Sequence, residues 1–201
     1  MEALHNINDL PIIDELKRNM MGMALLDLII MPQWEHRYFS FNSNWSEDEM
    51  MGSIRDGSGG ECYIHFTKYG AIGKVALDPS VLEIGEFLKL VPEEFSGFVN
   101  ESAFSITEST FIFWKRYADI YWSVYPNNLV QYDWFGTLKN GFPSYLVWAE
   151  SYYEMSFSRS TMESVFRNLS VTKEYIAELN PEINLSDIEV EIIEILGSQL
   201  S

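Results

Sequence analysis

The fold is decided by residues 37–77, which read RYFSFNSNWSEDEMMGSIRDGSGGECYIHFTKYGAIGKVAL. Apolar and polar residues alternate at the start of this stretch, over Phe39–Asn42. A period of two is typical of a strand with one buried face. The turn-prone run Asp56-Gly57-Ser58-Gly59-Gly60 and a break at Gly70 separate three further segments of strand character, at 51–55, 61–67 and 71–77. We therefore predict three or four antiparallel strands joined by short turns.

A helix is predicted before these strands, over about residues 10–31. Asn8 or Asp9 can cap it, Pro11 is tolerated in its first turn, and Pro32 ends it. The apolar side chains within it recur at helical spacing, so that one face is expected to pack inward.

Further elements are predicted after residue 90. Strands are expected over 110–115 and 120–124, and helices from Pro92 and over 143–155, 172–179 and 186–196. For the last helix, Ser186-Asp187-Ile188-Glu189 fits a capping box, although alternating Ile188, Val190 and Ile192 leave a strand open. The chain is thus predicted to be a single α+β domain over residues 1–201, with an N-terminal helix, an antiparallel β-meander of three to four or more strands, and C-terminal helices packed on the sheet.

The charge is strongly acidic, with 30 Asp and Glu residues against 13 Lys and Arg residues and a formal net charge of −17. Yet 15% of the residues are aromatic, which a disordered acidic tail would not be. These features indicate a folded domain with a negative exterior. Such a surface repels nucleic acid and anionic membranes, so neither is an expected partner. A basic protein is the partner that this charge favours.

Cysteine usage and the apolar run at 20–31 bear on localisation. Cys62 is the single cysteine, so no intrachain disulfide is possible, and a reducing, cytoplasmic setting is expected. The apolar run is interrupted by Asp27 and preceded by acidic residues, unlike a secretory signal, and it is too short to cross a bilayer. It is predicted to be a buried helix.

The glycine-rich stretch Arg55–Glu61 is the segment most like part of an enzyme. Backbone N–H groups of glycine-rich loops can bind phosphate. This loop lacks the Walker pattern, lies between strands and is flanked by acidic residues, so a hairpin turn is the favoured interpretation and a ligand loop the alternative. In either case Arg55 and Asp56 can form an exposed pair beside a cleft.

Cys62 and His65 are close in sequence, but on a strand their side chains point to opposite faces. They are therefore not expected to form a catalytic dyad, and Cys62 is expected to be a small buried residue. The histidines at positions 5, 36 and 65 show no spacing typical of metal ligands. We expect no metal and no cofactor, and assign no catalytic residue.

Thirteen aromatic residues lie between Ser109 and Ala149 in a segment of nearly neutral charge, with acidic segments on both sides. Core filling is the simplest explanation of so many rings. Tyr and Trp are also enriched at recognition surfaces, where a ring buries area and its polar end finds a partner. The candidate binding residues in this segment are Tyr117, Tyr121, Trp122, Tyr125, Tyr132 and Trp134.

Several stretches resemble an uncharacterised family of bacterial proteins with an Arg-Asp-Gly-Ser-Gly hairpin motif. They are 36–41 (HRYFSF), 53–59 (SIRDGSG), 92–95 (PEEF), 148–153 (WAESYY) and 179–182 (LNPE). In that family a Gly-Phe-Asp-His-Glu stretch follows the third strand. Here Val75-Ala76-Leu77-Asp78-Pro79 stands in its place, so that only Asp78 matches. The resemblance implies a bacterial cytoplasmic protein and no known activity.

These observations favour a non-enzymatic acidic binding protein, such as an immunity-type inhibitor that covers a basic surface on a toxin or nuclease. The alternative is a small-ligand-binding protein or enzyme with a cleft near Arg55, Asp56, Tyr63 and His65. A structural or scaffolding protein is the third interpretation.

Overall fold

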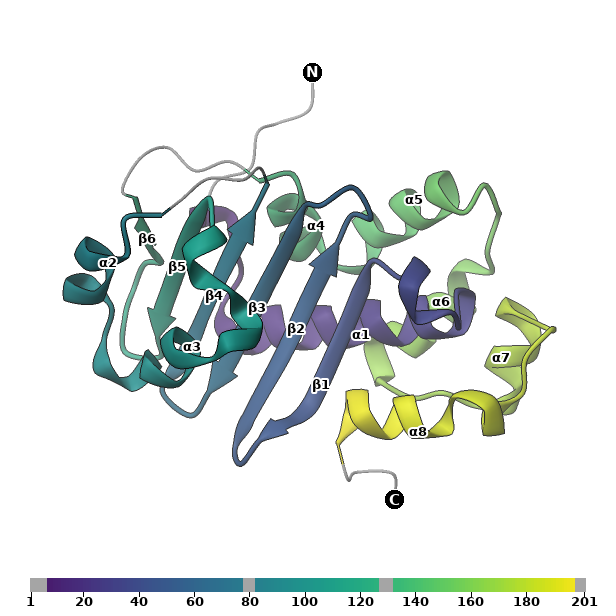
Figure 1. Ribbon diagram of the computed structural model, residues 1–201. Coiled ribbons are helices and arrows are strands. Elements are labelled where there is room, and N and C mark those ends of the chain that lie inside the picture. The colour runs from purple at the N-terminus through teal and green to yellow at the C-terminus, as the bar shows by residue number, and fades with distance from the viewer. Residues whose placement is uncertain (1–6, 78–81, 127–131, 198–201) are drawn as a thin grey trace.

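The computed structural model describes residues 7–77, 82–126 and 132–197, and it confirms the α+β class. A six-stranded antiparallel sheet follows an N-terminal helix, and the C-terminal helices pack on the sheet and on that helix (Figure 1). The strands run in sequence order across the sheet, as a meander. They are β1 (Phe39–Ser46), β2 (Glu49–Arg55), β3 (Glu61–Thr67), β4 (Gly70–Ala76), β5 (Phe111–Arg116) and β6 (Ser123–Tyr125).

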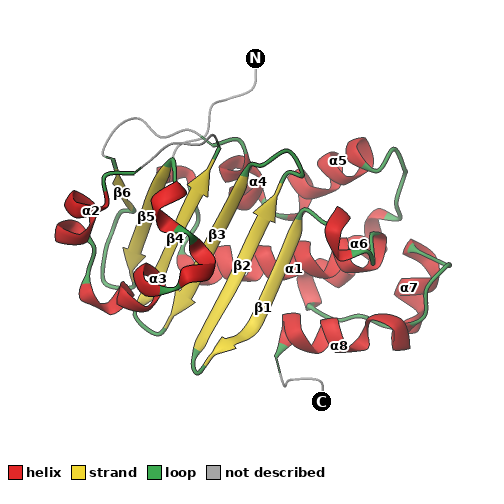
Figure 2. Ribbon diagram, in the orientation of Figure 1, coloured by secondary structure: helices red, strands yellow, loops and turns green. Residues whose placement is uncertain are grey.

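Helices surround the sheet on several sides (Figure 2). Figure 1 shows α1 behind the sheet, α3 in front of it, α2 beside β6 at one edge, and α5 to α8 gathered beyond β1 at the other. The helices are α1 (Ile13–Ile30), α2 (Ile84–Leu90), α3 (Ser96–Asn100), α4 (Trp134–Asn140), α5 (Phe142–Tyr152), α6 (Arg159–Asn168), α7 (Lys173–Leu179) and α8 (Leu185–Leu196), with short 3-10 helices η1 (Ile7–Asp9), η2 (Trp34–His36), η3 (Glu93–Phe95), η4 (Ser102–Phe104) and η5 (Ile106–Glu108). No helix of the described residues is long and apolar enough to cross a membrane.

Helix α1 ends before Pro32 as predicted, but the predicted caps are wrong. The helix begins at Ile13, its N-cap position is Ile12, and no side chain caps it. Asn8 and Asp9 belong instead to the separate turn η1. The residue before a proline is pushed away from helical geometry, so Pro11 keeps residue 10 out of the helix.

Helix α8 forms where the sequence predicted it and excludes the strand alternative. Its capping box uses Asn184 and Asp187, not Ser186. The helix therefore starts at Leu185, one residue before the predicted start. The predicted helix from Pro92 is split into η3 and α3, and helices α2, α4 and α6 were not predicted.

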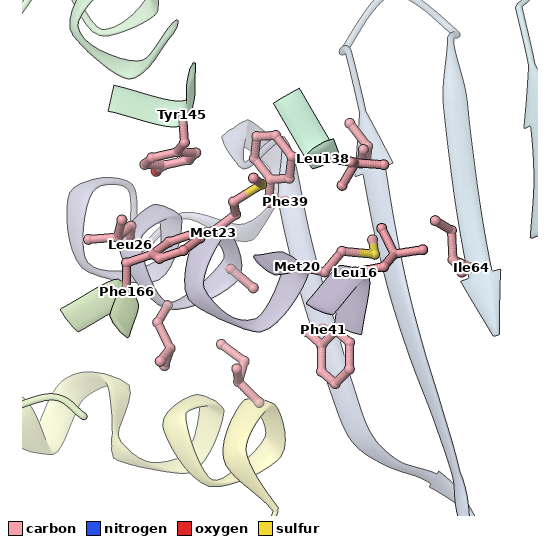
Figure 3. Close-up of a cluster of buried hydrophobic side chains, with 14 of the residues drawn as sticks. Leu16, Met20, Met23, Leu26, Phe39, Phe41, Ile64, Leu138, Tyr145 and Phe166 are labelled. Carbon is pink, nitrogen blue, oxygen red and sulfur yellow. The ribbon is translucent and has the colours of Figure 1, made fainter. Parts of the chain in front are cut away.

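The sheet divides the protein into two hydrophobic cores. On one face, Phe39, Ile54, Cys62 and Val75 are paired across four strands and pack with α1. Figure 3 shows side chains of α1 among those of β1 and the C-terminal helices in this core. The labelled residues are Leu16, Met20, Met23, Leu26, Phe39, Phe41, Ile64, Leu138, Tyr145 and Phe166.

The second core lies on the opposite face of the sheet, over β4 and β5. Ile72 and Trp114 face each other across these strands and pack with Phe87, Phe98 and Phe104 from the α2–η5 region. Over β1 and β2 the same face carries mostly polar side chains that are only partly buried, Ser40, Asn42 and Arg55, together with Met51. This part of the second face is where the sheet meets solvent.

Candidate functional site

The glycine-rich run forms the turn between β2 and β3, as predicted. One carboxylate oxygen of Asp56, Oδ1, accepts hydrogen bonds from the backbone N–H of Ser58 at 2.8 Å and of Gly60 at 2.9 Å. Gly57 and Gly59 take positive φ angles, of 71° and 107°, which glycine adopts without strain. Two loop amides are thus bound to Asp56, and a phosphate would have to displace that carboxylate.

Two hollows meet at Arg55. The first, which we call the turn groove, has a volume of about 590 Å³ and is lined by Tyr38, Tyr152, the Asp56–Gly60 turn and several charged residues. The second, which we call the sheet-face pocket, has a volume of about 300 Å³ and lies on the open face of β1 to β3. The sheet-face pocket is defined here by Trp34, Ser40, Trp45, Ser53, Arg55, Tyr63 and Phe104, with Asn42 and Glu194 also among its lining residues.

The guanidinium of Arg55 is held against an aromatic ring. Its central carbon lies 3.6 Å from the ring centroid of Trp34, and Nη2 donates to the Trp34 carbonyl at 3.4 Å. Arg55 faces Glu61 across the strands, but Glu61 pairs instead with the fully buried Lys74, at 2.7 Å from Nζ. No carboxylate of the described residues lies within 4.0 Å of the Arg55 guanidinium nitrogens, and its buried Nε finds no acceptor among them.

Burial lowers the pKa of Arg55 and the nearby Arg37 lowers it further, whereas Tyr63 and Glu61 oppose this effect. An arginine nevertheless remains protonated in proteins. Arg37 itself is saturated by the protein, because it donates to the carbonyls of Met31 and Pro32 and pairs with Glu191. Of these two arginines, only Arg55 has a guanidinium that forms no ion pair with the described residues and can therefore pair with a bound anion.

The walls of the sheet-face pocket are mainly aromatic. Trp45 stacks on Phe104 with ring centroids 5.6 Å apart, and Tyr63 lies 5.8 Å from the same ring. Burial raises the pKa of Tyr63, so its hydroxyl stays neutral. The hydroxyls of Ser40 and Ser53 bond each other at 2.6 Å, and Glu194 accepts from the Asn42 amide at 2.9 Å.

The structure brings together only some of the residues predicted for a cleft. Arg55 and Asp56 line the turn groove, and Arg55 and Tyr63 line the sheet-face pocket. His65 lies near Arg55 in sequence but lines neither hollow. It is buried beside Phe98 and Phe104, with Nε2 at 3.2 Å from Glu49.

Cys62 and His65 point to opposite faces of β3, as predicted, because Cys62 packs in the α1 core and His65 under α3 and η4. Burial raises the pKa of the Cys62 thiol well above its usual range. Burial also lowers the pKa of His65, although Glu49 opposes this effect. Among the described residues, no three His, Cys, Asp and Glu side chains are grouped so that they could hold a metal ion.

Most rings of the aromatic segment fill the two cores. Trp122 and Tyr132 are each only 7% exposed. Tyr125 packs on Phe87 and donates to the Glu83 carbonyl, and Trp134 is half-buried. Tyr117 and Tyr121 are exposed, Tyr121 to 73%. This segment therefore presents two candidate rings on the surface and not a continuous aromatic patch.

Trp34 and Trp45, which line the sheet-face pocket, were not predicted as site residues. Strict alternation along β1 would place Trp45 with Phe39 and Phe41 on the face toward α1. A register shift between Asn42 and Ser46 interrupts this alternation, and Trp45 packs with the second core. Little in the sequence indicated that Trp45 faces the pocket, because a β-bulge of this kind has no clear sequence pattern.

The C-terminal helices form an acidic layer. No Lys or Arg follows Lys173 in the sequence, whereas seven acidic residues do. A groove of about 690 Å³ lies between α7 and the start of α8. Its lining is mixed: the apolar side chains include Ile176, Pro181, Ile183 and Leu185, and the charged ones are Lys173 and Glu189. On α8, Val190 is 78% exposed and Ile193 is 40% exposed, one helical turn apart.

Several acids of this layer are engaged within the protein. Glu178 accepts from Thr161, Asp187 caps α8, Glu191 pairs with Arg37 and Glu194 accepts from Asn42. The side-chain carboxylates of Glu182 and Glu189 form no hydrogen bond or ion pair with other residues that the structure describes, although the backbone N–H of Glu182 donates to Oδ1 of Asn180 at 3.2 Å. Both residues are exposed. Their charges are therefore available to another molecule.

No family model, curated protein or solved structure matches this chain. The resemblance to a bacterial family thus stays a prediction from the quoted motifs. Asp78, the residue that matches the family stretch after the third strand, lies outside the described residues.

Proposed function

We propose that this chain is a non-enzymatic binding protein whose C-terminal layer docks on a basic surface of another protein. One observation carries the proposal: the groove between α7 and α8, whose lining is partly apolar, is bordered by two exposed acids, Glu182 and Glu189, whose carboxylates have no intramolecular partner among the described residues. Glu189 lines the groove, and Glu182 lies between the lining residues Pro181 and Ile183.

The layer combines the two forces that protein recognition uses. A net charge of −17 accelerates the approach of a cationic partner through long-range attraction. Exposed Val190 and Ile193, together with the groove lining, offer apolar area that a partner can bury after encounter. An immunity-type inhibitor, which covers a basic surface on a toxin or nuclease, is a protein of this kind.

The state of the reactive side chains supports a role without catalysis. Cys62 is the single thiol, and its burial in the α1 core keeps it protonated and out of reach of a substrate. His65, the buried imidazole of the sheet, lies between aromatic rings and lines no described hollow. A base or nucleophile in such surroundings is poorly placed to act on a bound molecule.

The test uses charge-neutral variants of equal size. Partners are captured from the native cell with the wild-type chain, identified, and purified, and association rates are measured at about 50 and about 500 mM salt. Glu182→Gln combined with Glu189→Gln should lower the association rate at low salt. The matched control, Glu93→Gln with Glu108→Gln, removes the same charge from exposed positions in η3 and η5.

We expect the double substitution Glu182→Gln and Glu189→Gln to lower the association rate constant at least about threefold more than the control double substitution does. High salt should remove this difference. Loss of the captured partner's activity in the complex would support the inhibitor form of the proposal. Binding that is indifferent to salt, or that responds equally to both pairs, would contradict the proposed docking surface.

A further inference from the structure

We propose that the sheet-face pocket binds a small monocarboxylate with a flat aromatic body, whose carboxylate pairs with Arg55 and whose ring packs against Trp45 and Tyr63. This ligand site is separate from the α7–α8 groove and does not depend on the protein partner proposed above. It is argued from the charge of Arg55, its fixed position, and the shape and lining of the pocket.

The first step is the unpaired charge of Arg55. The chain has 30 acidic residues, yet none of the described ones pairs with this guanidinium. Glu61, its cross-strand neighbour, is held by the buried Lys74. A partly buried cation without a counterion is costly, and an anionic ligand removes that cost.

The second step is the fixed position of the guanidinium. Stacking on Trp34 and the bond to the Trp34 carbonyl hold its plane before any ligand arrives. A planar guanidinium can donate two parallel hydrogen bonds to one carboxylate. Because the group is already ordered, binding loses little side-chain entropy.

The third step is the lining of the pocket. Its volume of about 300 Å³ is at the lower end of the range for ligand sites, which suits a molecule with one or two rings. Trp45 and Tyr63, which are both partly exposed, provide aromatic surface for a flat body, and the buried ring of Phe104 supports them from behind. The lining includes one carboxylate, Glu194, which would oppose a second negative charge, so that a monoanion fits better than a phosphate monoester.

The adjoining turn groove does not suit the same ligand. Its lining includes the acidic residues Glu35, Asp56 and Glu61. Besides Arg55 it contains Arg37, but Arg37 is already paired with Glu191. A carboxylate placed there would meet like charges. The aromatic pocket is therefore the side from which an anion can reach Arg55.

The experiment compares phenylacetate and indole-3-acetate with their neutral amides, by calorimetry and by NMR of the tryptophan indole N–H groups. Each acid should bind at least about tenfold more tightly than its amide, because only the acid forms the ionic pair. The indole signals of Trp34 and Trp45 should shift, and that of buried Trp122 should not. Equal binding of acid and amide, no saturable binding of either acid, or shifts confined to other tryptophans would overturn the proposal.

Two variants of Arg55 make the test specific. Arg55→Gln should weaken binding of the acids at least about tenfold, and Arg55→Lys should recover only part of the loss, since lysine keeps the charge without the planar fork. Arg116→Gln is the control, because Arg116 is an exposed arginine of β5 that pairs with Asp119. If Arg55→Gln does not fold, the binding of the acids to Arg55→Lys alone tests the proposal. Wild-type affinity in the folded Arg55 variant would overturn the assignment.

Discussion

The hydroxyl of Tyr145 donates a 2.6 Å hydrogen bond to Asp27, and both side chains are completely buried. Tyr153 donates to the same oxygen, Oδ1, at 3.2 Å. The backbone N–H groups of Tyr38 and Phe39 donate to the other oxygen, Oδ2, at 3.0 and 2.8 Å. One carboxylate thus joins α1 to the start of β1 and to α5, and it fixes the segment from which the sheet begins.

Asp27→Asn should destabilise the protein although it removes a buried charge. A protonated carboxyl group donates one hydrogen and accepts at both oxygens, whereas an amide NH₂ group donates two hydrogens and accepts none, so the two tyrosine hydroxyls would have to turn and accept. We expect a loss of about 2–4 kcal/mol in the free energy of unfolding, measured in urea at about pH 4. Asp48→Asn, in the exposed β1–β2 turn, should change it by less than about 0.5 kcal/mol. Equal stability of wild type and Asp27→Asn at that pH would show that these bonds are not needed.

The same residue should impose a pH dependence. Burial raises the pKa of Asp27 from 3.8 to about 6, and the hydrogen bonds from Tyr145, Phe39, Tyr38 and Tyr153 offset part of that effect. Because the folded state holds the proton more tightly, this contribution to stability is complete below pH 3.8 and is lost as the pH rises through about 6. The loss should be about 3 kcal/mol.

The pH effect is measured as the difference in unfolding free energy between wild type and Asp27→Asn. Other titrating groups are common to both proteins and cancel in that difference. The wild type should lose stability relative to the variant between about pH 4 and pH 7. A difference that is constant over this range would contradict a raised pKa for Asp27.

Gly73 should not tolerate a side chain. A Cβ at this position of β4 would lie 2.7 Å from the Tyr63 carbonyl oxygen and 2.6 Å from Cζ of Phe113. Gly73→Ala should therefore cost about 1–3 kcal/mol in thermal or urea unfolding. Gly85→Ala is the matched control, because nothing lies within 4 Å of its Cβ, and in helix α2 alanine should stabilise by up to about 1 kcal/mol. Losses of equal size at both sites would refute the steric explanation.

The pair Arg37–Glu191 should hold α8 against the start of β1. Glu191→Gln weakens this charge-assisted contact and should cost about 1–2 kcal/mol, with faster hydrogen exchange in α8. Glu189→Gln, on the same helix but without a described partner, should leave both quantities unchanged. If the two variants behave alike, α8 is held by its apolar face alone.

Local pattern predicted most of the fold. Alternation over residues 39–42 and the turn at 56–60 were enough for the first strands, because one face of the sheet is apolar and the turn needs glycine. Helices α2 and α4 have only seven residues each and no side-chain cap, whereas the equally short α7, which was predicted, is capped by Thr172. Helix α6 has a clear apolar side in Met162, Val165 and Phe166, and its spacing could have predicted it.

The candidate site was less predictable, because its parts come from distant segments. Arg55 was identified beside the glycine-rich turn. The absence of an ion pair at its guanidinium could not be predicted, because it depends on the ion pair that Glu61 forms with Lys74 on the next strand. Trp45 reaches the pocket through a register shift, and Phe104 through packing of η4 on the sheet. The density of aromatic residues between 109 and 149 suggested a recognition surface. Most of these rings instead pack inside the two hydrophobic cores.

The packing of α8 on β1 and α1 has a consequence for the order in which the protein is made. During synthesis the chain emerges from its N-terminus, so α1 and β1 leave the ribosome long before the helix that contacts them both. Until then the parts of α1 and β1 that α8 contacts lack their covering layer. A ribosome that stalls before residue 185 would hold a nascent chain with exposed apolar surface, which is the kind of segment that chaperones bind.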